Sequence, residues 1–414
     1  MSDPVDLDII IFYEHVGREL VTVQGLLDKF KEHNIRVRAY SYLYEYYKCL
    51  SECGGISPTH LIVPYVYNKN SLSRYRHLLD KYPGLQIVNM HHEQIVAPFN
   101  IAKAVPLHSI AIDNVLHVSW GEKYTDMLLN AGAPSDNIIQ ICSPRIPKKL
   151  DSVQRDILRE RLAAEFDLDL NKEWVLFCED RDWVVKDKVK MFKVLRKFGV
   201  HKTEVEEFFC HRAESLLLFC AEVNSLADNF FDRYELIYRS HPGVKGKVNL
   251  TDKVKMISSY SVYDWFQCVS FNIVDGSTSC FESDALNVKT ATHQPVDGLL
   301  KFRVFGIDQY AKLTHIADLL RKDVIVSLSS QSEKMIYQDY LGGTDLDFSD
   351  IFVNRIINYK GLITFERDLY GKRWYFLRKW AFEKFVTRLP LKYFSRLTNY
   401  FGYSWLSKDR PGEV

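Results

Sequence analysis

Short apolar runs alternate with stretches of helical periodicity along most of the chain, and this alternation restricts the fold more than any other feature. The runs are rich in Ile, Val, Leu and Phe, which is typical of parallel strands that are buried on both faces. We expect strands at 8–13, 36–40, 59–63, 85–89, 116–120, 137–141, 174–178, 235–239, 255–257, 269–274 and 289–292. Because repeated strand–helix units build a parallel sheet with helices on both faces, the sequence predicts an α/β fold.

The alternation occurs in two rounds, with a charge-rich helical stretch between them. A chain of 414 residues has the length of about two or three domains. The simplest architecture is two doubly wound, Rossmann-like domains that face a cleft. We expect an N-terminal domain over 1–147, a linker over 148–172, a second domain over 173–365 and C-terminal helices over 366–414.

Composition excludes several classes of protein. Lys and Arg number 54 against 53 Asp and Glu, so the chain lacks the basic excess that is typical of nucleic-acid-binding proteins. No apolar run reaches the roughly 20 residues needed to cross a bilayer, and the acidic N-terminus lacks the basic segment of a secretory signal. The eight cysteines are scattered and form no Cys-X-X-Cys pair, as in proteins of a reducing compartment. We therefore expect a cytoplasmic protein with no nucleic-acid partner.

Two polar loops follow strands of the second domain, Arg-Ser-His-Pro at 239–242 and Asp-Gly-Ser-Thr-Ser at 275–279. Open α/β sheets bind ligands beyond the carboxyl ends of their strands. A histidine there can donate a hydrogen bond to a phosphate oxygen, and hydroxyls at the start of a helix suit the same ligand. The alternative is structural, a turn histidine and simple helix capping. The predicted phosphate-binding residues are Arg239, His241, Ser277, Thr278 and Ser279.

Acidic and imidazole side chains follow two other strands, one in each domain. Asp180 and Asp182 follow the first strand of the second domain, and His91 and Glu93 follow the strand at 85–89. These four residues are the candidates for a catalytic acid or base. We predict no metal site, because neighbouring histidines such as His91 and His92 rarely aim at one ion.

The His-Pro loop, the Gly-Ser-Thr-Ser loop and Ser-Pro-Arg at 143–145 resemble motifs of GT-B-fold glycosyltransferases of bacterial surface-carbohydrate synthesis. These include the capsule and lipopolysaccharide Kdo transferases, which use CMP-Kdo, and the related CDP-glycerol transferases. The resemblance covers about residues 5–300, and it implies that the domain over 1–147 binds the acceptor and the domain over 173–365 binds the nucleotide donor. It implies that His241 and the hydroxyls of 277–279 hold the phosphates of a donor nucleotide, and that Glu282 accepts hydrogen bonds from the ribose.

The resemblance implies a metal-independent glycosyltransferase that moves a sugar from a nucleotide-activated donor to a surface polysaccharide or a glycolipid. The best match is a CMP-linked acidic sugar such as CMP-Kdo, and the donor is the substrate, so no cofactor is expected. Glycosyl transfer builds negative charge on the departing phosphate, which the enzyme must stabilise while it deprotonates an acceptor hydroxyl. Three alternatives stay open: a sugar-nucleotide 2-epimerase, a CDP-glycerol-type transferase and a non-catalytic scaffold of the same fold.

The segment 371–400 is basic and aromatic. It carries eight Lys or Arg residues against one acid, Glu383, and it includes Trp374 and Trp380. This pattern predicts amphipathic helices interrupted at Pro390. Such helices pack on the first domain, contact an anionic membrane surface, or do both with opposite faces. A lipid-linked acceptor would make peripheral attachment to the inner face of the cytoplasmic membrane useful.

Overall fold

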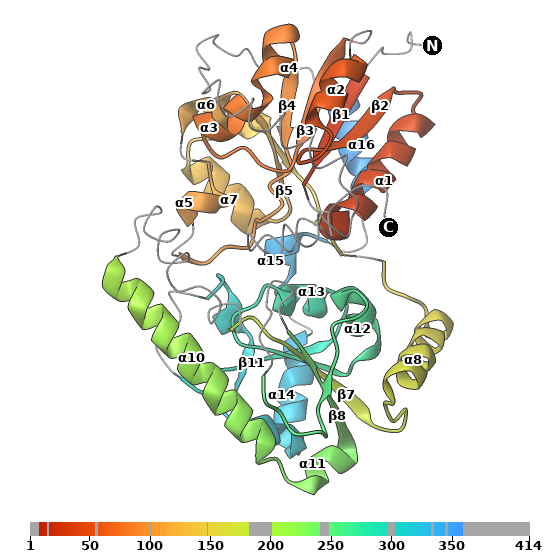
Figure 1. The fold of residues 1–414 in the computed structure, drawn as a ribbon, viewed down its shortest axis with the longest axis vertical. Helices are drawn as coiled ribbons and strands as arrows, with labels where there is room; N and C mark the ends of the chain where they lie inside the picture. The colour runs from red at the N-terminus through yellow and green to blue at the C-terminus, as the bar shows by residue number, and fades with distance from the viewer. Residues whose placement is uncertain are drawn as a thin grey trace, which may run out of the picture. The chain divides into compact units, whose positions relative to one another are not determined.

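The computed structural model describes residues 8–14, 16–53, 57–98, 101–106, 108–146, 148–181, 201–240, 248–296, 303–332, 335–343 and 347–358. They form two compact α/β units, drawn in Figure 1. The first unit gathers residues 1–94, 103–145 and 345–414, and the second gathers 95–102 and 146–344.

The first unit is built on a six-stranded parallel sheet with the order β2-β1-β3-β4-β5-β6. Its strands are β1 (Asp8–Tyr13), β2 (Val37–Ser41), β3 (Pro58–Val63), β4 (Gln86–Asn89), β5 (Leu116–Ser119) and β6 (Ile138–Gln140). Its helices are α1 (Val16–Glu32), α2 (Tyr46–Glu52), α3 (Lys69–Leu72), η2 (Ser73–Tyr75), α4 (Arg76–Lys81), α6 (Ser109–Asp113), α7 (Glu122–Asn130), η4 (Ser135–Asn137) and α16 (Phe348–Asn358). Helix α5 (Ile101–Ala104) spans the boundary between the two units.

The second unit is also built on a six-stranded parallel sheet, but with a different strand order, β12-β11-β10-β7-β8-β9. Its strands are β7 (Glu173–Cys178), β8 (Tyr234–Arg239), β9 (Lys255–Met256), β10 (Phe271–Val274), β11 (Lys289–His293) and β12 (Ala311–Leu313). Its helices are α8 (Ser152–Phe166), α10 (Lys202–Asn224), α11 (Asp228–Arg233), α12 (Val262–Cys268), α13 (Ser279–Ala285), η7 (Ile307–Gln309), η8 (Ile316–Leu320), α14 (Lys322–Ser332) and α15 (Gln338–Leu341).

Burial on both faces explains why the strands are almost wholly apolar. In β1, Ile9 and Ile11 belong to one core of the first unit, whereas Ile10 and Phe12 belong to the core on the other face of the sheet. Side chains alternate between the faces of a strand, so a strand that is covered on both sides needs an apolar residue at every position. The predicted α/β fold class of two Rossmann-like domains is confirmed, and all the predicted strands are present within a few residues.

The domain boundaries differ from the prediction in two ways. The expected linker belongs to the second unit, because Leu158 and Leu162 of α8 are buried there and the Arg159 guanidinium lies 4.0 Å from the centre of the Trp174 ring. The chain also returns to the first unit at α16. A Cβ on Gly25 of α1 would lie 2.9 Å from Ser349 Oγ, so glycine permits the close contact between α1 and α16. The predicted C-terminal helices over 366–414 lie outside the described residues.

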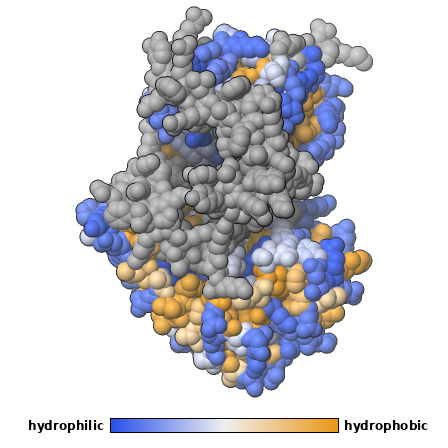
Figure 2. Space-filling model, in the orientation of Figure 1, coloured by the Kyte–Doolittle hydropathy of each residue, from blue (hydrophilic) through white to orange (hydrophobic). Residues whose placement is uncertain are grey.

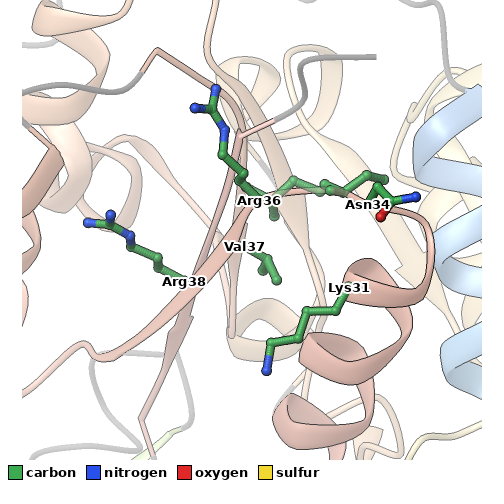
Figure 3. A pocket seen from close by; sticks show the side chains of 7 residues that line it. Lys31, Asn34, Arg36, Val37 and Arg38 are labelled. Carbon is green, nitrogen blue, oxygen red and sulfur yellow. The ribbon is translucent and has the colours of Figure 1, made fainter. Parts of the chain in front are cut away.

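A pocket of about 450 Å³ opens at the amino ends of β1 and β2, and Figure 3 shows the side chains that line it. Three of them, Lys31, Arg36 and Arg38, are basic. Strand β2 is the edge of its sheet, and charged side chains on an edge strand oppose pairing with a strand of another molecule. The pocket lies at the amino ends of its strands, whereas open α/β sheets bind ligands beyond the carboxyl ends, so we do not assign it to the candidate site.

On the face drawn in Figure 2, apolar residues are scattered among polar ones. Exposed large apolar side chains include Val21 on α1, Leu217 on α10 and Val326 on α14. Apolar residues that are exposed singly are usual on soluble proteins and identify no docking surface. Within the described part of the chain, the helices are too short or too polar to span a membrane.

His60 in β3 makes the stability of the first unit sensitive to acid. Its ring is 4% exposed, and burial lowers its pKa from 6.5 to about 4. Between these two values the unfolded chain binds a proton that the folded chain does not bind, so the free energy of unfolding falls as the pH falls. The loss is on the order of 3 kcal/mol at the acid end.

We expect His60→Leu to flatten this decline, measured by urea unfolding at pH 6.5, 5 and 4. Leucine suits the site, because His60 Nε2 has no hydrogen-bond partner among the described residues and Nδ1 contacts only Thr59 Oγ1, at 2.9 Å. His33→Leu, at an exposed turn, is the matched control. A variant that keeps the wild-type dependence on pH would contradict the assignment.

Candidate functional site

The order of the strands identifies one point in the second unit where a ligand is expected. From β7 the chain proceeds to β8 and β9 on one side, and then returns to place β10 on the other side of β7. Loops that follow two such strands diverge, and open α/β sheets bind ligands in the crevice between them. Here the loops are Glu179–Arg181, after β7, and Asp275–Thr278, after β10.

The loop after β10 carries the predicted hydroxyl groups. Ser277 and Thr278 are partly exposed and Ser279 is buried. The Ser277 hydroxyl accepts a hydrogen bond from the Ser279 amide at 3.3 Å, whereas the side chain of Thr278, the N-cap residue of α13, makes no capping bond. This local hydrogen bond therefore accounts for one of the three hydroxyls, and those of Thr278 and Ser279 have no such role among the described residues.

A network of buried charges lies directly beneath this loop. Asp275 accepts hydrogen bonds from Arg212 Nη1 and from Arg303 Nη2, each at 2.6 Å. Arg212 also donates to Asp180 Oδ2 at 3.2 Å, which links the ends of β7 and β10 through α10, the long helix in Figure 1. Burial acts to raise the pKa of Asp275, but Arg212 and Arg303 outweigh it and hold that pKa below its usual value.

A second ion pair extends the network after β7. Arg181 is fully buried, donates to both carboxylate oxygens of Glu179 and also bonds the hydroxyl and the carbonyl oxygen of Ser215. Its guanidinium lies 4.8 Å from the centre of the Phe219 ring. Among the described residues, the cluster thus holds three carboxylates and three guanidinium groups, whose charges balance.

Gly276 lets the backbone approach this cluster closely. A Cβ at this position would lie 3.1 Å from Arg212 Nη2, 3.2 Å from Asp180 Oδ2 and 3.3 Å from Arg303 Cγ. Because ion pairs hold all three neighbours, they have little freedom to move away. Any side chain at 276 would therefore push the loop off its charged support.

Asp180 was predicted as a catalytic acid or base, and the structure places it inside the network. Its carboxylate is bound to Arg212, it is 8% exposed, and burial raises its pKa above the usual value. Its Oδ1 has no hydrogen-bond partner in the part of the chain that is described. This geometry suits a residue that positions Arg212 and the 275–278 loop better than one that exchanges protons with a substrate. Asp182 lies outside the described residues.

Arg239 and Glu282 occupy the neighbourhood that was predicted for them, but both have protein partners. The Arg239 guanidinium donates to the carbonyl oxygens of Ser259 and Tyr260 at 2.7 and 2.5 Å, so it supports the loop after β9. Glu282, in the first turn of α13, accepts a hydrogen bond from the Tyr263 hydroxyl at 3.2 Å. The predicted phosphate ligand His241 lies outside the described residues.

His91 of the first unit is buried and cannot itself contact a substrate in this structure. Its Nε2 lies 2.8 Å from His117 Nδ1 and its Nδ1 lies 2.9 Å from the Tyr124 hydroxyl. The far ends of this chain are carbonyl oxygens, Ile112 O beside His117 Nε2 and Ala104 O beside the Tyr124 hydroxyl. When both rings are neutral, each imidazole has one N–H and Tyr124 has one O–H, so three hydrogens serve four contacts. The Tyr124 hydroxyl can therefore donate to only one of its two neighbours at a time.

Burial lowers the pKa of His91 well below its usual value, and lowers that of His117 to about 4, so both rings are neutral near pH 7. This series of hydrogen bonds therefore connects β4 and β5 to α5 and α6, and its role is structural. Glu93, two residues after His91, is exposed.

Sequence reasoning missed Arg212 and Arg303. A signal for Arg212 was present, because it lies on the buried stripe of α10 with Phe208, Ser215 and Phe219. A charged residue among apolar ones at helical spacing requires a buried partner. No comparable signal marks Arg303, which approaches Asp275 from a loop 28 residues further along the chain.

No family model matches the sequence, and no curated protein is similar to it in sequence. Among solved structures, the wall teichoic acid polymerase TagF is similar at a TM-score of 0.51 and 14% identity, over 86% of this chain and 90% of that one. A single-residue variant of TagF gives a TM-score of 0.52 at 11% identity, over 86% and 89% of the two chains.

A putative UDP-N-acetylglucosamine 2-epimerase from Listeria monocytogenes, with a TM-score of 0.46, 11% identity and coverage of 85% and 95%, is too distant to carry an argument. At such identities the similarity to TagF shows the fold. The chain has the GT-B type of architecture, in which two Rossmann-like α/β units follow one another.

Removal of Arg212 tests how far the second unit depends on the buried network. We expect Arg212→Met to lower the free energy of unfolding by about 3–5 kcal/mol, because it leaves Asp275 and Asp180 buried with too little positive charge. The matched control is Arg233→Met, which breaks an exposed pair with Glu173 (Nη2 to Oε2, 3.1 Å) and is expected to cost about 1 kcal/mol or less. Urea unfolding followed by tryptophan fluorescence measures both, and equal losses would argue against the network's role.

Proposed function

We propose that the protein is a glycosyltransferase that moves a sugar from a nucleotide-activated donor to a saccharide or lipid-linked saccharide acceptor. The observation that carries this proposal is the hydroxyl-bearing loop 275–279, which lies at the turning point of the second sheet and rests on the network of Arg212, Asp275 and Arg303. A loop fixed in this way is preorganised, and preorganised donors stabilise developing charge without further rearrangement. The GT-B fold supports the same proposal.

In the proposed reaction, an acceptor hydroxyl oxygen forms a bond to the anomeric carbon while the bond from that carbon to the donor phosphate breaks. His241, Ser277 and Thr278 would bind the departing phosphate. The acceptor proton would pass to a carboxylate, for which Glu93 and Asp182 are the candidates. Metal independence stays a prediction.

The resemblance favours a CMP-linked acidic sugar such as CMP-Kdo as the donor. A CDP-glycerol-type transferase is the second candidate, because the solved structures with the same fold include a wall teichoic acid polymerase. The epimerase alternative has less support. Such epimerases carry two consecutive glutamates after the corresponding loop, whereas here Glu282 is followed by Ser283. Ser283 is buried and its hydroxyl is hydrogen-bonded to Asn272 and Thr290.

A nucleotide panel separates these possibilities. We expect CMP or CDP, but not UDP, to raise the melting temperature of the wild-type protein, because bound ligand stabilises the folded state by mass action. Ser277→Ala/Thr278→Ala should abolish the shift, and Ser258→Ala, at an exposed serine of the second unit, should leave it unchanged. Absence of a shift with every nucleotide would favour the scaffold, and UDP-GlcNAc turnover without acceptor would favour the epimerase.

His241→Ala tests the role of the His-Pro loop in turnover. Loss of one hydrogen-bond donor to a developing charge lowers the rate by about 10²–10³. We expect that loss in donor consumption measured with saturating acceptor, at an unchanged melting temperature. His33→Ala, at an exposed histidine of the first unit, is the control. Wild-type turnover in His241→Ala would remove His241 from the phosphate site.

Membrane attachment through 371–400 is tested by sedimentation with liposomes. We expect binding to vesicles that contain phosphatidylglycerol and release as salt rises, because the attraction between lysine or arginine and anionic lipid is screened. Vesicles of phosphatidylcholine alone are the control. A protein that stays in the supernatant even at low salt would reduce the segment to a structural role.

A further inference from the structure

The pocket at the amino ends of β1 and β2 has no part in the proposed reaction, and its lining is strongly basic. Its walls come from the end of α1, from the turn that follows and from the start of β2, as Figure 3 shows. Its volume of about 450 Å³ is typical of sites that hold a small molecule. Lys31, Arg36 and Arg38 carry positive charge, and none of the seven described lining residues is acidic. We name these three residues the basic rim.

The turn between α1 and β2 fixes the backbone that carries the basic rim. Asn34 has a left-handed backbone (φ 58°), and its amide donates to the Lys31 carbonyl oxygen at 2.9 Å. The Ile35 amide donates to the Phe30 carbonyl oxygen at 2.9 Å, and both of these side chains are buried. Bonds of this kind close the carboxyl end of a helix and set the direction in which the chain leaves it. The cations from α1 and from β2 are therefore held around one pocket before a ligand binds.

The contacts of Lys31 and Arg38 leave their charge effective. Arg38 Nη1 donates to the carbonyl oxygen of Glu52 at 3.3 Å, while the Glu52 carboxylate accepts a hydrogen bond from the Tyr40 hydroxyl at 3.0 Å. A carbonyl oxygen steadies the guanidinium without neutralising it. Lys31 Nζ lies 3.9 Å from Asp28 Oδ1, and both side chains are more than half exposed, so water weakens that attraction.

Each cation also has a local explanation. Lys31 lies in the last turn of α1, where positive charge suits the helix dipole, and Arg36 and Arg38 border the edge of the sheet. Neither explanation requires a cavity. Neither requires that cations from a helix and from a strand line the same cavity. A ligand of opposite charge accounts for both features.

The chemistry of the basic rim favours phosphate groups. Guanidinium groups bind phosphate oxygens through paired N–H donors, and an ammonium group adds a compact positive charge. The three side chains leave from different positions around Val37, so their charges are spread around the pocket and not gathered at one point (Figure 3). A ligand with several phosphate groups therefore meets more of these charges than a single phosphate does.

We propose that the basic rim binds a ligand that carries two or more phosphate groups, at a site separate from the loop 275–279. The proposal does not rest on the proposed transferase function, because every lining residue belongs to the first unit. Such phosphate groups occur on soluble polyphosphate esters and on the headgroups of phosphorylated inositol lipids. The experiment therefore tests the shared chemistry first and the source second.

The test is isothermal titration calorimetry of the full chain with sodium tripolyphosphate at low salt. We expect saturable binding to the wild type, about tenfold weaker binding of inorganic phosphate, and an affinity that falls as salt rises because exposed charges are screened. Lys31→Gln/Arg38→Gln should weaken tripolyphosphate binding about tenfold, which is the size of two exposed ion pairs. Lys148→Gln/Lys149→Gln removes the same charge from exposed lysines of the second unit and is the matched control, with no change expected.

Two further variants keep the test decisive. Arg36→Gln, at an exposed position, should weaken binding about threefold and replaces the double variant if that variant does not fold. The loss caused by Lys31→Gln/Arg38→Gln should be the same when Ser277→Ala/Thr278→Ala is also present, because the proposed site does not include the loop 275–279.

Sedimentation with phosphatidylcholine vesicles that contain phosphatidylinositol bisphosphate distinguishes the two sources. Stronger pelleting of the wild type than of Lys31→Gln/Arg38→Gln would identify a lipid headgroup, and equal pelleting beside rim-dependent tripolyphosphate binding would identify a soluble ligand. Three results would overturn the proposal: no tripolyphosphate binding by the wild type, an unchanged affinity in the folded rim variants, or an equal loss in Lys148→Gln/Lys149→Gln.

Discussion

The ion pairs between Asp275 and the two arginines Arg212 and Arg303 are the interaction on which the second unit depends most. They connect the end of β10 to α10 and to the loop that precedes η7, and through Asp180 they reach the end of β7. A single buried charge is strongly destabilising because it loses its hydration. In the network, the attraction and the hydrogen bonds between opposite charges offset this loss. The network therefore fixes the 275–279 loop in one position, and Gly276 allows the loop to lie directly on it.

Burial divides the candidate residues into two kinds. Asp180 and His91 were attractive as an acid or base, but both are buried and bound to neighbours, so they are suited to hold other groups in place. Thr278 and Glu93 keep contact with solvent and are suited to meet a ligand. A side chain that exchanges protons with a substrate must reach it, whereas a positioning residue gains from the absence of water.

Both units are doubly wound parallel sheets, but they differ in strand order and in the chemistry of their loops. In each sheet the direction in which strands are added reverses beside the first strand, which is β1 in the first unit and β7 in the second. Polar residues follow the strands at this point in both units. In the second unit these are hydroxyls above a balanced cluster of charges, which is suitable for a phosphate. In the first unit they are the stacked rings of Tyr65 and Tyr67 and the carboxylate of Glu14, which accepts a hydrogen bond from the Tyr65 hydroxyl.

The sequence alone determined the α/β class, the two rounds of strands and the loops in which polar residues would collect, because these depend on patterns within a few residues. The run Ile9–Phe12 could be recognised as a doubly buried strand, and Ser277–Ser279 as the residues after a strand. The three-residue strand β12 carried no such pattern. Only the tertiary structure decided that α8 belongs to the second unit, that His91 is sealed between His117 and Tyr124, and that Arg212 meets Asp275 from 63 positions away. Local periodicity reports which face of an element is buried, but it does not report which distant charge will be buried opposite it.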